Sequence, residues 1–284
     1  GEALGIGSNG DTDESMSKQL EEIARNIKDG ITSEEVQDLL PFGGARNALD
    51  CALWDIKAKR AGKSIWRLLN IKPKPLATVA TISIQSPSEM AAEALEYSKY
   101  NNLKIKLSAD EPIAVLEAIR AARPDAALIV DVNQGWSFDE LEHYIPYAHK
   151  LGIKMIEQPL AREGDEELEG FKSIVPLGAD ESCRDSSEYE ICAKRYDVIN
   201  IKLDKCGGLT DALNIIKLAN EDGKGLMVGN MCGSSLSMAP SYVVGQFCQY
   251  IDIDGPLFLK NDVDDGLEYQ DGGIVSLPEQ KLWG

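Results

Sequence analysis

Residues 128–157 read LIVDVNQGWSFDELEHYIPYAHKLGIKMIE. The stretch begins and ends with short aliphatic runs, LIVDV (128–132) and IKMIE (153–157), and the segment between them is predicted to be helical. A strand, a helix and a second strand in this order predict two parallel strands joined by a crossover helix.

The same alternation continues on both sides of this stretch. Eight short runs of aliphatic or β-branched residues recur about every two dozen residues: ATVATISI (77–84), LKIKL (103–107), LIVDV (128–132), IKMIE (153–157), PLGAD (176–180), VINIK (198–202), LMV (226–228) and YIDI (250–253). Eight β-α units are what a TIM-type (β/α) barrel of the α/β class requires. An open doubly wound sheet is the alternative, but no G-x-G-x-x-G follows the first run, and eight even units favour closure.

The first 70 residues have a different pattern. Apolar residues at helical spacing predict one helix over Glu14–Ile27 and another over Ala45–Gly62, the second ending at a glycine. Pro73 and Pro75 then separate this helical region from the alternating units.

The formal net charge of the 284-residue chain is −18. This charge argues against binding to nucleic acids and to anionic membranes, because both select basic surfaces. The six cysteines are scattered without a C-x-x-C pair, which predicts reduced thiols and a cytoplasmic location. The only histidines, His143 and His149, fall in one predicted helix, which argues against a histidine zinc site or a Ser-His-Asp triad.

Three consecutive runs carry a carboxylate at or next to their last residue: Asp131, Glu157 and Asp180. Barrel enzymes carry their catalytic residues at the carboxyl ends of strands, where neighbouring strands lie about 4.8 Å apart. Acids this close repel one another unless a cation or protons lie among them. An oxygen ligand set without His or Cys favours Mg²⁺, which keeps coordination positions open for a substrate.

Lysines flank the three acids. The second run presents Lys104 and Lys106, the sixth run presents Lys202, and the second and sixth strands of an eight-stranded barrel stand on opposite sides. This arrangement suits removal of the proton next to a carboxylate, because a metal stabilises the enediolate and a lysine near a cation favours its neutral, basic form. Two opposed lysines allow the proton to leave one face and return to the other.

Each of these residues also has an ordinary structural interpretation. An aspartate at a strand end often caps the next helix, and a lysine there is often a surface charge or the partner of a carboxylate. Five such residues in register across five strands are much harder to explain in this way.

The spacing of these residues resembles the enolase superfamily in its muconate-lactonizing-enzyme-like subgroup, for which a lysine base and Mg²⁺ are already known. The resemblance implies an acid/base pair, Lys106 and Lys202, and three Mg²⁺ ligands, Asp131, Glu157 and Asp180. Lys104 would neutralise the substrate carboxylate or support Lys106. Asn133 and Glu181 would lie behind the ligands.

Asp252-Ile253-Asp254, followed by Gly255-Pro256, resembles the D-x-D motif of dipeptide epimerases. A dipeptide carries an α-ammonium group that a pair of carboxylates would bind, and a turn before Gly255 is the structural alternative. The resemblance implies a Mg²⁺-dependent isomerase that acts on the α-carbon of the C-terminal residue of a dipeptide such as L-Ala-D/L-Glu. Such 1,1-proton transfer through an enediolate would serve cell-wall peptide recycling.

Other functions remain open at this point. The nearest alternative is an N-acylamino acid racemase or an o-succinylbenzoate synthase on the same scaffold. Alternatives of other classes are a Schiff-base aldolase that uses a barrel lysine and a non-catalytic metal-binding barrel scaffold.

The resemblance also implies the domain organisation. Residues 1–75 would be the helical part of an N-terminal α+β capping domain whose upstream strands are absent from this sequence, so we expect the 284 residues to be a portion of a longer chain. Residues 76–284 would form the barrel, with a C-terminal segment that returns to the capping domain. The partner would be a small dipeptide, and members of this subgroup often form homo-oligomers.

Overall fold

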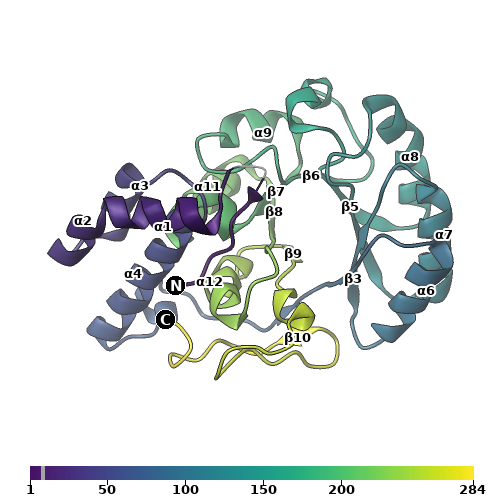
Figure 1. Cartoon of the computed structure of the whole chain (residues 1–284). Helices are drawn as coiled ribbons and strands as arrows, with labels where there is room; N and C mark the ends of the chain where they lie inside the picture. The colour runs from purple at the N-terminus through teal and green to yellow at the C-terminus, as the bar shows by residue number, and fades with distance from the viewer. Residues whose placement is uncertain (8–9) are drawn as a thin grey trace.

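The computed structural model describes residues 1–7 and 10–284 of the chain. Within these residues, a parallel sheet of eight strands runs in sequence order from β2 to β9 (Figure 1). Its strands are β2 (Ala80–Ile82), β3 (Asn102–Lys106), β4 (Ala127–Asp131), β5 (Ile153–Glu157), β6 (Leu177–Ala179), β7 (Val198–Ile201), β8 (Gly225–Val228) and β9 (Tyr250–Ile251). The predicted α/β barrel is confirmed.

The first and last strands of the sheet meet. The backbone N–H of Val79, just before β2, donates to the carbonyl of Ile251 in β9 at 2.9 Å. The strand order contains no reversal in the part of the chain that the structure describes. A reversal is what an open doubly wound sheet requires, so that alternative is wrong.

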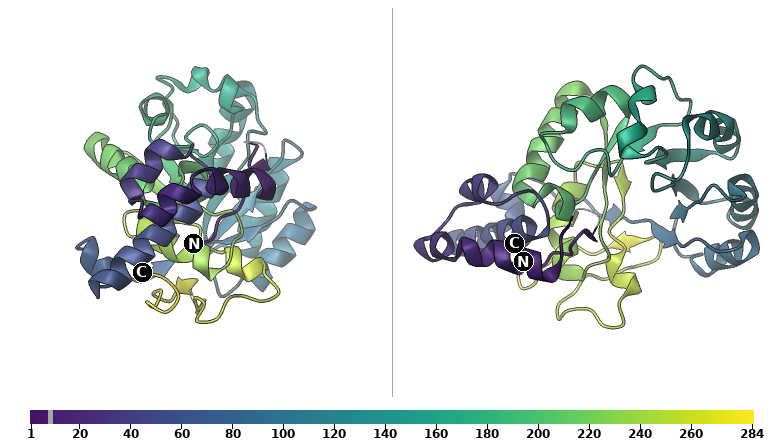
Figure 2. Two further views of the ribbon diagram at one scale, coloured as in Figure 1. Left: turned by 60° about the vertical axis from the view of Figure 1, so that its left-hand side comes forward. Right: turned by 45° about the horizontal axis from the view of Figure 1, so that its top comes forward.

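Helices cover the outside of the sheet (Figures 1 and 2). They are α6 (Pro87–Glu96), α7 (Pro112–Ala122), α8 (Phe138–Lys150), α9 (Tyr189–Arg195), α11 (Leu209–Asp222) and α12 (Ser235–Gly245). Ser86 and Ser137 begin α6 and α8 with reciprocal capping boxes, which satisfy backbone N–H groups of the first turn.

The expected strand-helix alternation is wrong at two places. After β5 the chain forms only short 3₁₀ turns, η2 (Arg162–Gly164) and η3 (Glu166–Leu168), because this charged segment contains glycine and little apolar surface to pack. After β9 it forms another 3₁₀ turn, η4 (Gly255–Phe258). Because no α-helix follows β5 or β9 directly, loops lie at the carboxyl ends of these two strands.

The N-terminal region is helical, with α1 (Asp13–Glu22), α2 (Ala24–Asp29), α3 (Ser33–Leu39), α4 (Gly44–Ala61) and α5 (Ile65–Leu68). The predicted helix Ala45–Gly62 is confirmed as α4, and Gly62 ends it in the left-handed conformation. The single helix predicted over Glu14–Ile27 is wrong in one respect. It breaks at Ile23, whose side chain packs with Val36 and Leu40 in a separate small core.

Helix α4 docks on the turn that follows β7. A guanidinium N–H of Arg46 donates to the carbonyl of Cys206, the last residue of α10 (Leu203–Cys206), at 2.7 Å. Gly208 has φ +113°, and a Cβ there would lie 2.5 Å from Oδ2 of Asp50. Glycine is therefore required where the helical region contacts the loop after Lys202.

The strand predicted over 77–84 is divided between two sheets. Strand β1 (Leu76–Ala77) pairs antiparallel with β10 (Ile274–Val275), and only β2 belongs to the barrel. The division occurs because the Thr78 N–H bonds to Gly273, whereas the Val79 N–H bonds to Ile251. Beyond β10, the chain returns to α4, where the Trp283 indole donates to the carbonyl of Cys51 at 2.8 Å. Both termini lie beside α4 in Figures 1 and 2.

Side chains inside the barrel form two layers. A lower apolar layer contains Val79, Ile129, Met155, Val198 and Met227. Two residues further along three of these strands, the same inner face carries Asp131, Glu157 and Asn200, because alternate residues of a strand share a face. The sheet therefore places a polar layer at its carboxyl end, over an apolar floor. None of the described helices is long and apolar enough to cross a membrane.

Candidate active site

The three predicted metal ligands lie next to one another at the carboxyl end of the sheet. Asp131 and Glu157 are register partners on β4 and β5, and Asp180 directly follows β6. All three side chains are almost completely shielded from solvent. Sequence spacing therefore placed these acids together correctly.

The Lys104 ammonium lies at the centre of this acid cluster. Its Nζ is 3.0 Å from Oδ2 of Asp131, 2.9 Å from Oε2 of Glu157 and 2.8 Å from Oδ2 of Asp252. Burial would lower the pKa of Lys104, but the charges of Asp131, Asp252 and Glu157 outweigh it and hold the pKa well above its usual range. Lys104 is a fixed positive charge among the acids, and its side chain is almost completely shielded from solvent.

Lys106 borders the cluster from β3, and its side chain is 29% exposed. Its Nζ donates to Oδ2 of Asp131 at 2.6 Å and to Oδ1 of Asn133 at 2.7 Å. The Asn133 amide in turn donates to Oε1 of Glu181 at 3.3 Å. Asn133 and Glu181 thus lie beside Lys106 and the acids, and the Asn133 contact helps to fix the position of the Lys106 ammonium.

Lys202 borders the cluster from the other side. Its Nζ donates to Oδ2 of Asp180 at 2.6 Å, and its side chain is 9% exposed. Burial would lower the pKa of Lys202, but the charge of Asp180 outweighs it and raises the pKa. Asp180 shows the reverse, because Lys202 and Lys205 overcome the effect of burial and hold its pKa well below its usual range.

The negative charge of Glu157 is only partly balanced by its neighbours. Burial, followed by the charge of Asp131, raises the pKa of Glu157 to about 7. The same burial is outweighed at Asp131 by Lys104 and Lys106, so the pKa of Asp131 is lowered. The ammonium groups neutralise the cluster only in part, and Glu157 would gain from a further positive charge.

The donor set fits a divalent cation. Glu157 Oε2 is buried and accepts no hydrogen bond of good geometry from the described residues, although the Lys104 ammonium lies 2.9 Å from it. Asp180 Oδ2 accepts a hydrogen bond from Lys202. Hard carboxylate oxygens in a converging set are ligands that Mg²⁺ prefers. In the described part of the chain, however, no three acid, histidine or cysteine side chains already meet the geometry of a metal site. Binding would require Lys202 to release Asp180.

The Asp252–Asp254 pair lies at the carboxyl end of β9. Asp252 Oδ2 contacts Lys104, and Asp254 Oδ2 accepts from the backbone N–H of Thr81 at 2.9 Å. The Asn230 amide lies between the two, 2.9 Å from Oδ1 of Asp252 and 3.2 Å from Oδ1 of Asp254. Burial, followed by the charge of Asp252, raises the pKa of Asp254 to about 7. The pair is a concentrated negative site beside the acid cluster.

Three amides around the site were not predicted: Asn200 and Gln158, which are buried, and Asn230, which is half-buried. Asn200 donates to Oε1 of Glu157 at 2.6 Å, Gln158 accepts from the backbone N–H of Asp180 at 2.9 Å, and Asn230 bridges the D-x-D pair. Asn200 lies two residues before Lys202, so strand alternation could have identified it. Gln158 gives no such signal, because its φ of +37° turns its side chain out of the strand pattern.

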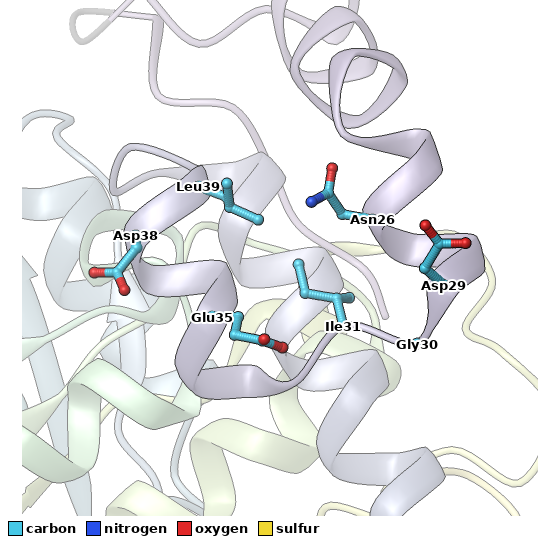
Figure 3. A pocket seen from close by; sticks show the side chains of 7 residues that line it. All are labelled: Asn26, Asp29, Gly30, Ile31, Glu35, Asp38 and Leu39. Atoms are coloured by element: carbon cyan, nitrogen blue, oxygen red, sulfur yellow. The ribbon is translucent and has the colours of Figure 1, made fainter.

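A separate hollow lies between α2 and α3, far along the chain from these residues (Figure 3). It is lined by Asn26, Asp29, Gly30, Ile31, Glu35, Asp38 and Leu39. Glu35 is already used there, since its carboxylate accepts from the backbone N–H of Thr32 in a capping box. This hollow contains none of the predicted site residues.

Family models match both parts of the chain. Residues 3–70 match the mandelate racemase/muconate lactonizing enzyme N-terminal domain, and residues 88–281 match the enolase C-terminal domain-like family. The chain belongs to the enolase superfamily.

Curated relatives of the chain include epimerases and a racemase. The chain is 38% identical over 277 residues to the N-acetyl-D-glutamate racemase of Pseudoalteromonas sp., covering 96% of this chain and 88% of the relative. It is also 38% identical over 268 residues to the L-Ala-D/L-Glu epimerase of Escherichia coli (strain K12), covering 93% and 84%.

Solved structures with a similar fold include relatives that contain a bound dipeptide. An enolase family member from Agrobacterium tumefaciens with homology to dipeptide epimerases, with bound sodium and L-Ala-L-Glu, has a TM-score of 0.95 and 41% identity, covering 99% of this chain and 86% of the other. The dipeptide epimerase from Cytophaga hutchinsonii complexed with Mg and D-Ala-L-Val has a TM-score of 0.81 and 30% identity, covering 87% and 71%.

Proposed function

We propose that the chain is a Mg²⁺-dependent dipeptide epimerase that inverts the α-carbon of the C-terminal residue of a dipeptide such as L-Ala-D/L-Glu. One observation carries the proposal. Lys106 and Lys202, from the second and sixth strand positions of the barrel, approach the same acid cluster from opposite sides, and each is hydrogen-bonded to a different acid of it.

In this proposal the two lysines exchange a proton with the same carbon atom. With Asp180 bound to Mg²⁺, the charge that raises the pKa of Lys202 would be neutralised. One lysine would then remove the α-proton as a neutral amine, while the other, as an ammonium, delivers a proton to the opposite face. The contacts of Lys106 with Asp131 and Asn133 and of Lys202 with Asp180 hold both Nζ atoms at the acid cluster. Asn133 would also hold Lys106 in place when Asp131 binds Mg²⁺.

Asp131, Glu157 and Asp180 would hold Mg²⁺, the cation of several solved relatives. When bound, the ion would neutralise the charge that builds on the substrate carboxylate as the α-proton leaves. Asn200 and Gln158 would keep Glu157 and Asp180 in position, through the side chain of Glu157 and the backbone of Asp180. Lys104 would limit the repulsion among the acids.

The D-x-D pair would select the substrate. Asp252 and Asp254 offer negative charge to the α-ammonium group of a dipeptide. An N-acylated amino acid has no such cation. A second candidate nevertheless has support, because a relative with 38% identity is an N-acetyl-D-glutamate racemase. Substrate preference between these two classes depends on the D-x-D pair.

Solvent deuterium exchange separates the candidates. We would incubate the protein with Mg²⁺ in D₂O and follow the α-proton of L-Ala-L-Glu and of N-acetyl-L-glutamate by NMR. Asp254→Asn is a cleaner probe than a change at Asp252, because Asp252 also contacts Lys104. Loss of one charged hydrogen bond should lower kcat/KM for the dipeptide about 10- to 100-fold and leave the N-acetyl substrate unaffected. Asp271→Asn, at an exposed acid, is the matched control.

Faster exchange of N-acetyl-L-glutamate by the unaltered protein would favour the racemase instead. Absence of exchange for every dipeptide and N-acyl substrate would favour a non-catalytic barrel, and borohydride trapping of a carbonyl substrate would reveal a Schiff-base enzyme. A role in cell-wall peptide recycling, a cytoplasmic location, a homo-oligomeric state and the division into residues 1–75 and 76–284 remain predictions.

A further inference from the structure

Lys205 is a buried lysine beside the acid cluster to which the proposed mechanism gives no role. Its side chain is only 5% exposed. The ammonium donates to three backbone carbonyls: that of Asp180, that of Cys183 at 3.0 Å and that of Asn200 at 3.1 Å. Three N–H groups meet three carbonyls, so the ammonium cannot move without leaving buried acceptors unpaired.

The same ammonium also lies 2.7 Å from Oδ1 of Asp180, an ion pair without the angle of a hydrogen bond. Around Asp180 almost every polar atom is therefore held in place. The backbone N–H donates to Oε1 of Gln158 at 2.9 Å, the carbonyl accepts from Lys205, and Oδ1 faces the Lys205 charge. Only Oδ2 is bonded to a group that can leave.

That group is Lys202. Its ammonium makes a single hydrogen bond among the described residues, to Oδ2 of Asp180 at 2.6 Å. Lys202 can therefore turn away at the cost of one contact, whereas Lys205 cannot. A divalent cation at Oδ1 would lie close to a fixed positive charge and be repelled, while at Oδ2 it would replace a mobile one.

We infer that Lys205 is a positioning residue: it locks Asp180 so that Oδ2 alone is offered to a metal ion. The inference rests on the proposed function, because it assumes that Asp180 is a ligand. Lys205 does not touch the substrate in this arrangement and acts only through Asp180. The chain thus uses two lysines on one carboxylate, a fixed one to orient it and a mobile one to be released.

The test measures Mg²⁺ binding itself by titration calorimetry, with no substrate present. Lys205→Met removes the charge and the three donors while keeping most of the side-chain volume. Residues that orient a metal ligand typically contribute 10- to 100-fold in metal affinity, so we expect Mg²⁺ to bind the variant at least 10-fold more weakly. Lys224→Met is the matched control, because Lys224 also donates to a backbone carbonyl, that of Tyr196 at 2.8 Å, but does not touch the site.

A kinetic measurement distinguishes positioning from general stability. With L-Ala-L-Glu as substrate, the Mg²⁺ concentration for half-maximal rate should rise in Lys205→Met by the same factor as the dissociation constant. The kcat at saturating Mg²⁺ should fall much less, because Lys106 and Lys202 are unchanged.

Lys205→Gln, which keeps amide donors for the carbonyls but not the charge, provides a second variant if Lys205→Met does not fold. Mg²⁺ affinity within twofold of the unaltered protein in either folded variant overturns the inference. So does failure of both variants to fold while Lys224→Met folds, since Lys205 would then serve stability alone. If the unaltered protein itself binds no Mg²⁺, the proposed function fails instead.

Discussion

Replacing Lys104 by methionine should destabilise the protein and make its stability depend on Mg²⁺. The Lys104 ammonium lies within 3.0 Å of carboxylate oxygens of Asp131, Glu157 and Asp252. Methionine fills a similar volume but leaves these acids without their shared counter-charge. Removing one partner of a buried ion pair costs about 3–5 kcal/mol, and proton uptake by Glu157, whose pKa is already about 7, keeps the cost within that range.

We therefore expect the free energy of unfolding at pH 7, in a chelating buffer, to fall by about 3–5 kcal/mol in Lys104→Met. Denaturant unfolding followed by circular dichroism measures this difference. Adding Mg²⁺ should stabilise the variant more than the unaltered protein, because no ammonium competes for the acids, so the difference should shrink by about 1 kcal/mol or more.

The control is Lys154→Met, at an exposed position of β5. It should change the free energy of unfolding by no more than about 0.5 kcal/mol, with or without Mg²⁺. If Lys104→Met is as stable as this control in chelating buffer, the Lys104 ammonium does not balance the acid cluster and the electrostatic reasoning is wrong.

Three further predictions concern stability. Gly208→Ala should cost about 2–4 kcal/mol, since it combines positive φ with a clash against Asp50, whereas Gly223→Ala, at φ +67° in open space, should cost about 1 kcal/mol by denaturant unfolding. Burial raises the pKa of Asp50 to about 6, so the folded state binds its proton more tightly than the unfolded state and stability falls as pH rises from about 4 through 6. Asp50→Asn should flatten that part of the stability–pH curve by up to about 3 kcal/mol, and an unchanged slope would contradict it. Mg²⁺ at about 100 times its dissociation constant should stabilise the unaltered protein by about 2.7 kcal/mol and raise its Tm, and EDTA should reverse this, whereas an equal Tm in both buffers would show that no metal binds.

The barrel could be predicted because its signal repeats. Short apolar runs recur at even intervals, and strand alternation places Asp131 and Glu157, near the ends of two of them, on one inner face. The strand with which each run pairs was harder to predict. Residues 77–84 read as one strand, but the hydrogen bonds of Thr78 and Val79 lead to different sheets, and no local pattern records that difference.

The composition of the site was predictable, but the contacts within it were only partly so. Spacing places Lys104 on the same face as Lys106 but does not show that its ammonium lies at the centre of the acids. Lys205 is harder still, because its position depends on the single turn of α10 and on Gly207, which ends that turn in the left-handed conformation. Such contacts arise from tertiary packing, which residue spacing does not encode.

The opposed placement of Lys106 and Lys202 is tested most directly by α-proton exchange in D₂O with single lysine variants. The unaltered protein, with Mg²⁺, should exchange the α-proton of both L-Ala-L-Glu and L-Ala-D-Glu and interconvert them. Lys106→Met and Lys202→Met should each lose interconversion, and any remaining exchange should be confined to one epimer, a different one for each variant. If either variant still interconverts the epimers at the unaltered rate, the two lysines do not act on opposite faces of the substrate.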